Sequence, residues 1–146
     1  MSRDRFAVVV HVLLFDRASH PNELFLLRRA GTGFMDGFYV PPGGHQEAGE
    51  SVLEAARREV REEAGFDPGI LTPVCVLPYR SGRHQGINFV FETDVGQAQP
   101  LLGEPERSDR AEWLPLHALP EPLAPWLADA LELREQGGWF RELAYS

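Results

Sequence analysis

Lysine is absent from this sequence of 146 residues, so all 14 basic side chains are arginines. Schiff-base chemistry is therefore excluded, as are the phosphate-holding lysines of Walker A loops and protein kinases. The only cysteine, Cys75, excludes an internal disulfide and a multi-thiolate metal site. Hydrophobic runs all fall short of the roughly 20 residues that span a membrane. Without lysine, fixed positive charge must come from arginine. The single cysteine and the short hydrophobic runs lead us to expect a cytoplasmic protein without a membrane partner.

Acidic residues outnumber basic residues by 22 to 14, which gives the chain a formal net charge of −8. Proteins that bind nucleic acid nonspecifically gain affinity from cations that displace counterions, so this balance argues against binding to duplex nucleic acid. The acidic balance does not exclude binding of a small anionic substrate. A chain of this length buries roughly two-thirds of its unfolded surface on folding. We expect one domain, residues 1–146, without repeats or linkers.

Hydrophobic periodicity predicts an α/β fold with a mixed sheet between helices. Alternating and β-branched runs predict strands at residues 6–15, 24–29, 38–40, 70–79 and 86–95, and a short strand around Trp113. Amphipathic patterns predict helices at residues 51–64 and 123–136, each followed by glycine. The first run is better explained as a buried strand than as a signal peptide, because Asp4 and His11 interrupt the signal pattern and no small-residue cleavage site follows.

Acidic side chains are concentrated in residues 44–66, where six glutamates accompany three arginines. Most such runs are solvated helix faces, and that alternative applies here too. At about 100° per residue, however, Glu59 and Glu63 continue a stripe that is apolar one and two turns earlier. Arg58 flanks this acidic edge and is expected to hold the carboxylates by ion pairing. The spacing therefore favours an inward-leaning acidic edge.

Carboxylates on an inward face cost free energy, because like charges repel one another and burial opposes ionisation. A divalent cation would relieve both effects. Ligation by oxygen alone, without histidine or thiolate, selects Mg²⁺ first and Mn²⁺ second. Since Mg²⁺ commonly bridges carboxylates to substrate phosphates, this helix is a candidate docking site for a diphosphate.

Residues 44–66 resemble the signature of the Nudix hydrolases. That signature is a glycine, five residues, a glutamate, seven residues, and then Arg-Glu-hydrophobic-X-Glu-Glu-X-Gly-hydrophobic. Its fixed positions are met by Gly44, Glu50, Arg58, Glu59, Val60, Glu62, Glu63, Gly65 and Phe66. Upstream, residues 39–44 (YVPPGG) are similar to the family's Trp-X-Leu-Pro-Gly-Gly, and residues 103–105 and 113–120 are similar to MutT-like members. The resemblance covers nearly the whole chain.

The resemblance implies an α/β/α sandwich and a cytosolic enzyme that uses Mg²⁺, with Mn²⁺ as a possible substitute. Such an enzyme hydrolyses a nucleoside diphosphate linked to a further group, with attack of water on one phosphorus. By motif, the metal ligands are Glu59, Glu62 and Glu63 with the Gly44 carbonyl. Glu50 and Arg58 support the loop and the helix. Glu62 is the first candidate for the catalytic base, and the other candidates are Glu47, Glu104 and Glu106.

The substrate is less visible in the sequence. A nucleoside triphosphate or its damaged form, giving a monophosphate and pyrophosphate, is the first expectation. The alternatives are ADP-ribose, a nucleotide sugar or a dinucleoside polyphosphate, and a noncatalytic nucleotide-sensing module. Arg28 and Arg29 follow the second strand and are candidates to clamp a phosphate, or are solvated strand-end residues. Phe34, Phe38 and Tyr39 either stack on a base or pack in the core. We expect a monomer or a homodimer.

Overall fold

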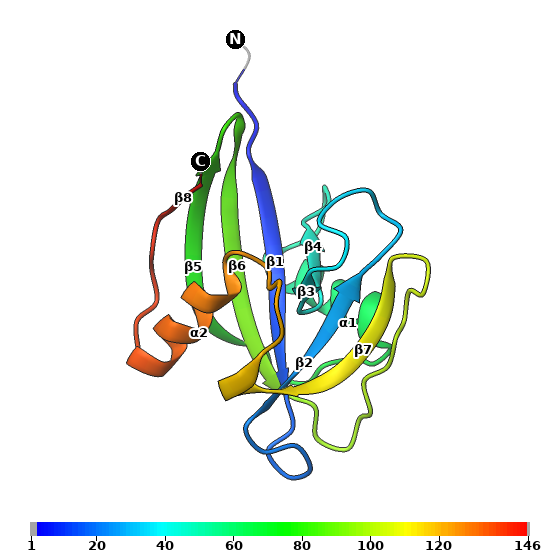
Figure 1. The fold of residues 1–146 in the computed structure, drawn as a ribbon. Helices are drawn as coiled ribbons and strands as arrows, with labels where there is room; N and C mark the ends of the chain where they lie inside the picture. The colour runs from blue at the N-terminus through cyan, green and yellow to red at the C-terminus, as the bar shows by residue number, and fades with distance from the viewer. Residues whose placement is uncertain (1–2, 146) are drawn as a thin grey trace.

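The structure is a computed structural model that describes residues 3–145 (Figure 1). Its larger sheet has the strand order β4-β1-β6-β5-β8, formed by β1 (Ala7–Phe15), β4 (Gly43–His45), β5 (Thr72–Ser81), β6 (His84–Asp94) and β8 (Leu143–Tyr145). A smaller sheet has the order β3-β2-β7, formed by β2 (Glu23–Arg29), β3 (Tyr39–Val40) and β7 (Ser108–Pro115). The predicted α/β class with a mixed sheet is confirmed, although the strands divide between two sheets.

Strand β1 lies inside the larger sheet, between β4 and β6. It pairs parallel to β6 along its whole length and antiparallel to β4, with Val10 opposite Gly44. A strand covered on both faces needs apolar side chains at odd and even positions, which explains the nearly continuous apolar run of β1. Pairing with β4 fixes the glycine-rich segment against this strand.

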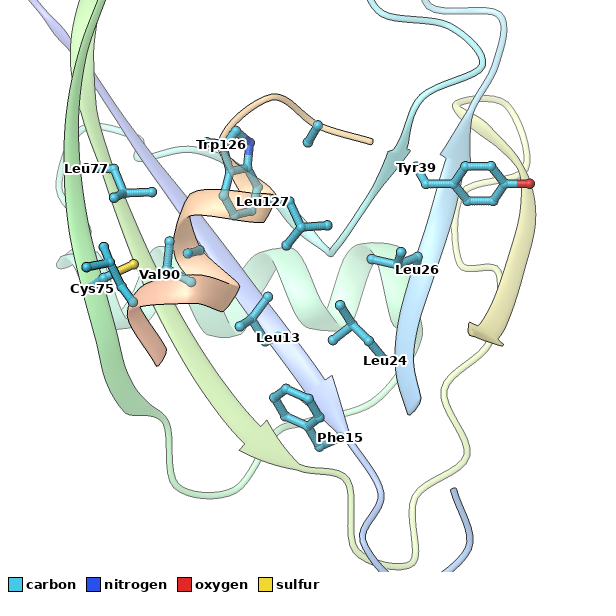
Figure 2. Packing of buried hydrophobic residues seen from close by; sticks show 13 residues of the cluster. Leu13, Phe15, Leu24, Leu26, Tyr39, Cys75, Leu77, Val90, Trp126 and Leu127 are labelled. Atoms are coloured by element: carbon cyan, nitrogen blue, oxygen red, sulfur yellow. The ribbon is translucent and has the colours of Figure 1, made fainter. Parts of the chain in front are cut away.

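Two hydrophobic clusters lie on the two faces of the larger sheet. Leu13 and Phe15 of β1 belong to the cluster that includes helix α2 (Leu127–Gln136), which Figure 2 shows. Val12 and Leu14 belong to the cluster that includes helix α1 (Val52–Ala64). This division follows from the alternation of side chains along a strand. The two helices therefore cover opposite faces of the sheet, as the sandwich prediction requires.

The boundaries of α1 agree with the sequence prediction. Ser51 is the N-cap and forms a capping box with Glu54, and Gly65 ends the helix with a φ of 77°. Helix α2 instead begins four residues later than predicted, because the segment before it pairs with β3: Leu123 is bridged to Tyr39. No helix within residues 3–145 is long and apolar enough to cross a membrane.

Three strands differ from the sequence prediction. Strand β7 spans eight residues, where the sequence predicts only a short strand around Trp113. Strands β4 and β8 have no counterpart in the prediction. Each has only three residues, and β4 pairs with β1 while β8 pairs with β5. Such short strands have little signal of their own, because cross-strand neighbours stabilise them.

His11 is buried in the core of the sheet, as its strand position predicts. Its Nε2 lies 2.8 Å from Oδ1 of Asn88, whose side-chain amide donates to the Leu77 carbonyl. The imidazole also stacks on Trp126, with ring centroids 3.8 Å apart. Burial lowers the pKa of His11 to about 4. The ring is therefore neutral in the folded protein at neutral pH.

Acid is expected to destabilise the protein through His11. The pKa of His11 is near 6.5 when unfolded and about 4 when folded, so between these values only the unfolded state binds the proton. Stability is full above the unfolded pKa and falls as the pH is lowered, by about 3 kcal/mol for this shift. Urea unfolding of the wild type and His11→Gln across this range tests the effect. The free-energy advantage of the wild type should shrink toward acid, and an advantage independent of pH would contradict the assignment.

Candidate active site

Helix α1 presents three glutamates at increasing exposure. Glu59 is buried, with 8% of its surface exposed, Glu63 is half-buried and Glu62 is exposed. Because Ala56 and Val60 anchor the same side of the helix in the core, Glu59 and Glu63 are drawn inward with them. The inward-leaning acidic edge that the spacing predicts is present.

The glycines of β4 bring backbone directly against these carboxylates. The amide of Gly43 donates to Oε2 of Glu63 at 2.9 Å. A Cβ atom on Gly44 would collide with the carboxylate of Glu59, so a larger residue here would displace that side chain. The pairing of β4 with β1 and the packing of α1 thus produce one compact site.

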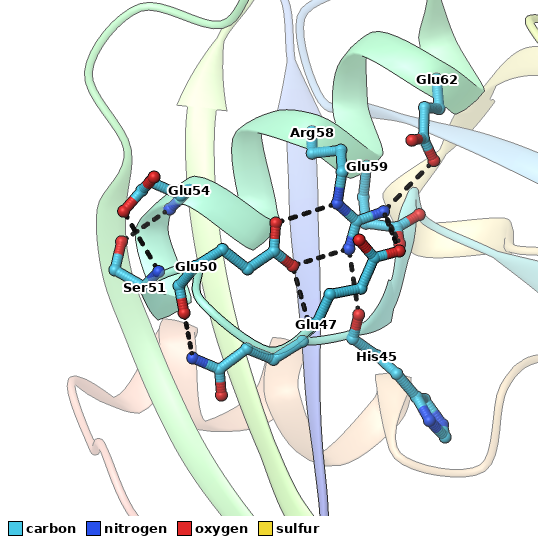
Figure 3. A network of polar contacts seen from close by, with 9 residues as sticks. His45, Glu47, Glu50, Ser51, Glu54, Arg58, Glu59 and Glu62 are labelled. Atoms are coloured by element: carbon cyan, nitrogen blue, oxygen red, sulfur yellow. Dashed lines mark hydrogen bonds and ion pairs between the residues drawn. The ribbon is translucent and has the colours of Figure 1, made fainter.

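Arg58 joins the loop to the helix, as Figure 3 shows. Its Nε and Nη2 donate to the two oxygens of Glu50, at 3.0 and 2.8 Å, and Nη2 also donates to the His45 carbonyl. Nη1 donates to Glu59 at 2.9 Å and to Glu62 at 3.3 Å. Hydrogen bonds from Arg58 lower the pKa of Glu50 to about 2. The predicted ion pairing of Arg58 with the acidic edge is present.

The two inner carboxylates have too little positive charge around them. Burial raises the pKa of Glu59 to about 7, against the opposing effect of Arg58. Burial raises the pKa of Glu63 to about 8, although the Gly43 amide opposes this, and the neighbouring carboxylates raise it further. A carboxylate with such a pKa needs a proton or a cation to be stable.

A divalent cation fits this donor set. The available ligands are carboxylate and carbonyl oxygens, which suit Mg²⁺ and Mn²⁺. Within the described part of the chain, no three side chains of His, Cys, Asp or Glu are already grouped as a metal site. Glu59 and Glu62 contact Arg58, and Glu63 contacts the Gly43 amide. The burial of Glu59 beside Gly44, rather than a preformed cage, is what makes the residues suitable for a cation.

A distant loop adds another carboxylate to the site. The amide of Gly103 donates to the Glu63 carbonyl at 3.0 Å, and a Cβ on Gly103 would collide with the backbone of α1. This contact brings Glu104 to the site. Burial is the main cause that raises the pKa of Glu104, and the negative charge of Glu62 raises it further. Glu106, on the same loop, is exposed. The family resemblance includes residues 103–105 and makes Glu104 a candidate base, but it does not show that Gly103 contacts α1, since this loop lies far along the chain from the helix.

Both arginines at the end of β2 are engaged within the chain. Arg28 donates from Nε and Nη2 to Asp109 of β7, at 2.8 and 2.5 Å. Arg29 donates to the Phe34 carbonyl and to the Thr32 hydroxyl, and its guanidinium lies 5.8 Å from the Phe34 ring centroid. Their contact with a substrate phosphate stays a prediction. Tyr39 packs in the core, whereas Phe34 is 66% exposed.

A model of the NUDIX domain matches residues 5–133. The mouse protein "8-oxo-dGDP phosphatase NUDT18" is 31% identical over 138 residues, covering 93% of this chain and 41% of that protein. The "ADP-ribose pyrophosphatase" of Methanocaldococcus jannaschii is 35% identical over 102 residues, covering 68% of this chain and 59% of that protein. The chain therefore spans about half the length of these relatives.

Among solved structures, the fold is similar to that of a MutT NUDIX hydrolase from Burkholderia pseudomallei. The TM-score is 0.80 at 24% sequence identity, covering 89% of this chain and 98% of that one. This likeness independently supports the layered arrangement of sheets and helices.

Arg58→Gln should destabilise the protein far more than Arg61→Gln on the same helix. The Arg58 side chain is 18% exposed, and its loss leaves Glu50 and Glu59 uncompensated, which should cost about 3 kcal/mol. The ion pair of Arg61 with Asp67 is 49% and 75% exposed, so its loss should cost less than about 1 kcal/mol. Urea unfolding without added metal measures both. Equal losses would show that Arg58 does not hold the loop and helix together.

Proposed function

This chain belongs to the NUDIX family, and we propose that it hydrolyses the diphosphate linkage of a nucleoside diphosphate derivative with a divalent cation. Mg²⁺ is the proposed cation and Mn²⁺ its substitute. The observation that carries the proposal is the burial of Glu59 and Glu63 against the glycines of β4, which raises the pKa of both side chains. A cation would stabilise these carboxylates in their charged form and give an acidic protein affinity for a phosphate substrate.

The proposed cation ligands are Glu59, Glu62 and Glu63 with the Gly44 carbonyl. When bound, the cation would supply charge neutralisation at the phosphate oxygens and activation of the attacking water. Glu50 and Arg58 orient the loop and the helix for this task.

Glu62, itself a proposed cation ligand, is also the proposed general base, because its carboxylate is 45% exposed, far more than that of Glu59. Glu104 is the second candidate, since its pKa is raised and it approaches the same edge. Glu47, which is 67% exposed, and Glu106, which is also exposed, rank behind them. Arg28 and Arg29 are proposed to contact substrate phosphate by exchanging part of their present hydrogen bonds.

A nucleoside triphosphate or a damaged nucleotide is the proposed substrate, with a monophosphate and pyrophosphate as products. The relative named an 8-oxo-dGDP phosphatase supports a damaged nucleotide, and with such a diphosphate the second product would be phosphate instead of pyrophosphate. The relative named an ADP-ribose pyrophosphatase supports a nucleotide-sugar-like alternative. A noncatalytic nucleotide sensor would not need Glu59, Glu62 and Glu63 together, and this chain has all three. We propose a cytoplasmic location, and a monomer or homodimer.

Hydrolysis should require both Glu63 and a divalent cation. Purified protein with Mg²⁺ should release phosphate or pyrophosphate from at least one member of a panel of nucleoside triphosphates, 8-oxo nucleotides, ADP-ribose, a nucleotide sugar and a dinucleoside tetraphosphate. Glu63→Gln should reduce the rate about a hundredfold or more, because it removes a charged ligand from the reacting centre. Glu135→Gln, an exposed glutamate of α2, is the matched control and should keep full activity.

Two results would contradict this function. Hydrolysis that persists in excess EDTA would remove the role of the cation. Binding of several nucleotides without turnover of any would favour the sensing module. Circular dichroism of Glu63→Gln separates loss of chemistry from loss of fold.

A further inference from the structure

The donors of Arg58 fall into two groups with different partners. Nε and Nη2 are held by Glu50 and by the His45 carbonyl, none of which is a proposed cation ligand. Nη1 alone is bound to Glu59 and Glu62, which are both proposed ligands. A cation that draws both carboxylates toward itself would therefore remove partners from one nitrogen of Arg58 and leave the other two in place.

The loss of those partners has a physical cost. The Arg58 side chain is only 18% exposed, so water cannot fully replace a lost carboxylate at Nη1. A buried donor left without an acceptor is destabilising, and more so when it is charged. A replacement acceptor near Nη1 would lower the cost of moving Glu59 and Glu62 to the cation.

Glu47 meets the requirements for this replacement. Its Oε1 lies 3.7 Å from Nη1 of Arg58, beyond hydrogen-bond distance but within reach of a small side-chain movement (Figure 3). Its backbone is anchored, because the Glu47 amide donates to Oε1 of Glu50 at 2.8 Å. Its side chain is 67% exposed, so few packed neighbours hold it in its present position.

The charges around the guanidinium support the same exchange. Four carboxylates surround Arg58 at hydrogen-bond or ion-pair distance, those of Glu47, Glu50, Glu59 and Glu62. Only Glu47 among them is neither a proposed cation ligand nor already bound through both oxygens to Arg58. It is thus the carboxylate left to neutralise Nη1 once the cation holds Glu59 and Glu62.

We propose that Glu47 is a positioning residue that accepts a hydrogen bond from Nη1 of Arg58 when Glu59 and Glu62 turn toward a bound divalent cation. This inference rests on the proposed function, because it assumes a cation at Glu59 and Glu62. In this role Glu47 acts through Arg58 and does not touch the cation or the substrate, which replaces its lower-ranked candidacy as general base.

The test compares Glu47→Gln with Glu106→Gln. Both variants remove one exposed negative charge: Glu106 lies near Glu104 on the loop that contacts α1, whereas Glu47 lies beside Arg58. Calorimetric titration with Mg²⁺ should give an affinity for Glu47→Gln that is about two- to fivefold weaker than for Glu106→Gln, the range expected of a partly exposed ion pair. Without Mg²⁺, the two variants should unfold at similar urea concentrations.

The side-chain resonances of Arg58 supply a readout that a general structural role would not move. In ¹⁵N-edited spectra of the wild type, Nη1 should stay hydrogen-bonded and slow to rotate both with and without Mg²⁺. In Glu47→Gln, rotation of the Nη1 group should stay slow without Mg²⁺ and become free once Mg²⁺ is added. Nε should be unchanged in all four samples, because Glu50 holds it throughout.

The outcomes separate this inference from the function on which it rests. Equal Mg²⁺ affinities for the two variants, or Nη1 of Glu47→Gln staying slow with Mg²⁺, would overturn the role of Glu47 and leave the proposed function standing. Failure of the wild type to bind Mg²⁺ would overturn both. Freely rotating Nη1 in Glu47→Gln before Mg²⁺ is added would show that Glu47 holds Arg58 in every state, which also contradicts the exchange.

Discussion

The burial of carboxylates against backbone is the constraint on which this site depends. Glu59 and Glu63 are drawn inward by the apolar side of α1 and meet the glycines of β4, where burial raises the pKa of each. Most other features of the region limit the cost of that burial. The Gly43 amide donates to Glu63, and Arg58 binds Glu59 while it holds the loop through Glu50. What these contacts leave uncompensated is the charge that a divalent cation would neutralise.

This constraint connects the composition of the chain to its proposed chemistry. A protein with a formal charge of −8 and no lysine repels a polyphosphate unless positive charge is supplied locally. Arg58 is committed to carboxylates, and Arg28 is paired with Asp109. The proposed cation therefore has two tasks: it stabilises the buried glutamates, and it gives the substrate phosphates a positive partner.

The local parts of this arrangement could be predicted from the sequence, because helical spacing and capping signals fix them. Glu59, Glu63 and the flanking Arg58 lie on α1 where a period of 3.6 residues puts them, and Gly65 ends the helix as expected. The contact of Gly103 with α1 and the late start of α2 could not be predicted. Each depends on a partner far away in the chain, as does the pairing of Arg28 with Asp109.

The most direct measurement of the proposed cation site is a titration with Mn²⁺ followed by paramagnetic broadening of backbone amide resonances. We predict that broadening begins at Gly43 and Gly44 and at the α1 residues from Glu59 to Glu63, and that Glu59→Gln weakens it there. Resonances of α2, on the opposite face of the sheet, should stay sharp at the same Mn²⁺ concentration. Broadening that begins elsewhere, or that is unaffected by Glu59→Gln, would contradict a cation site built on these buried carboxylates.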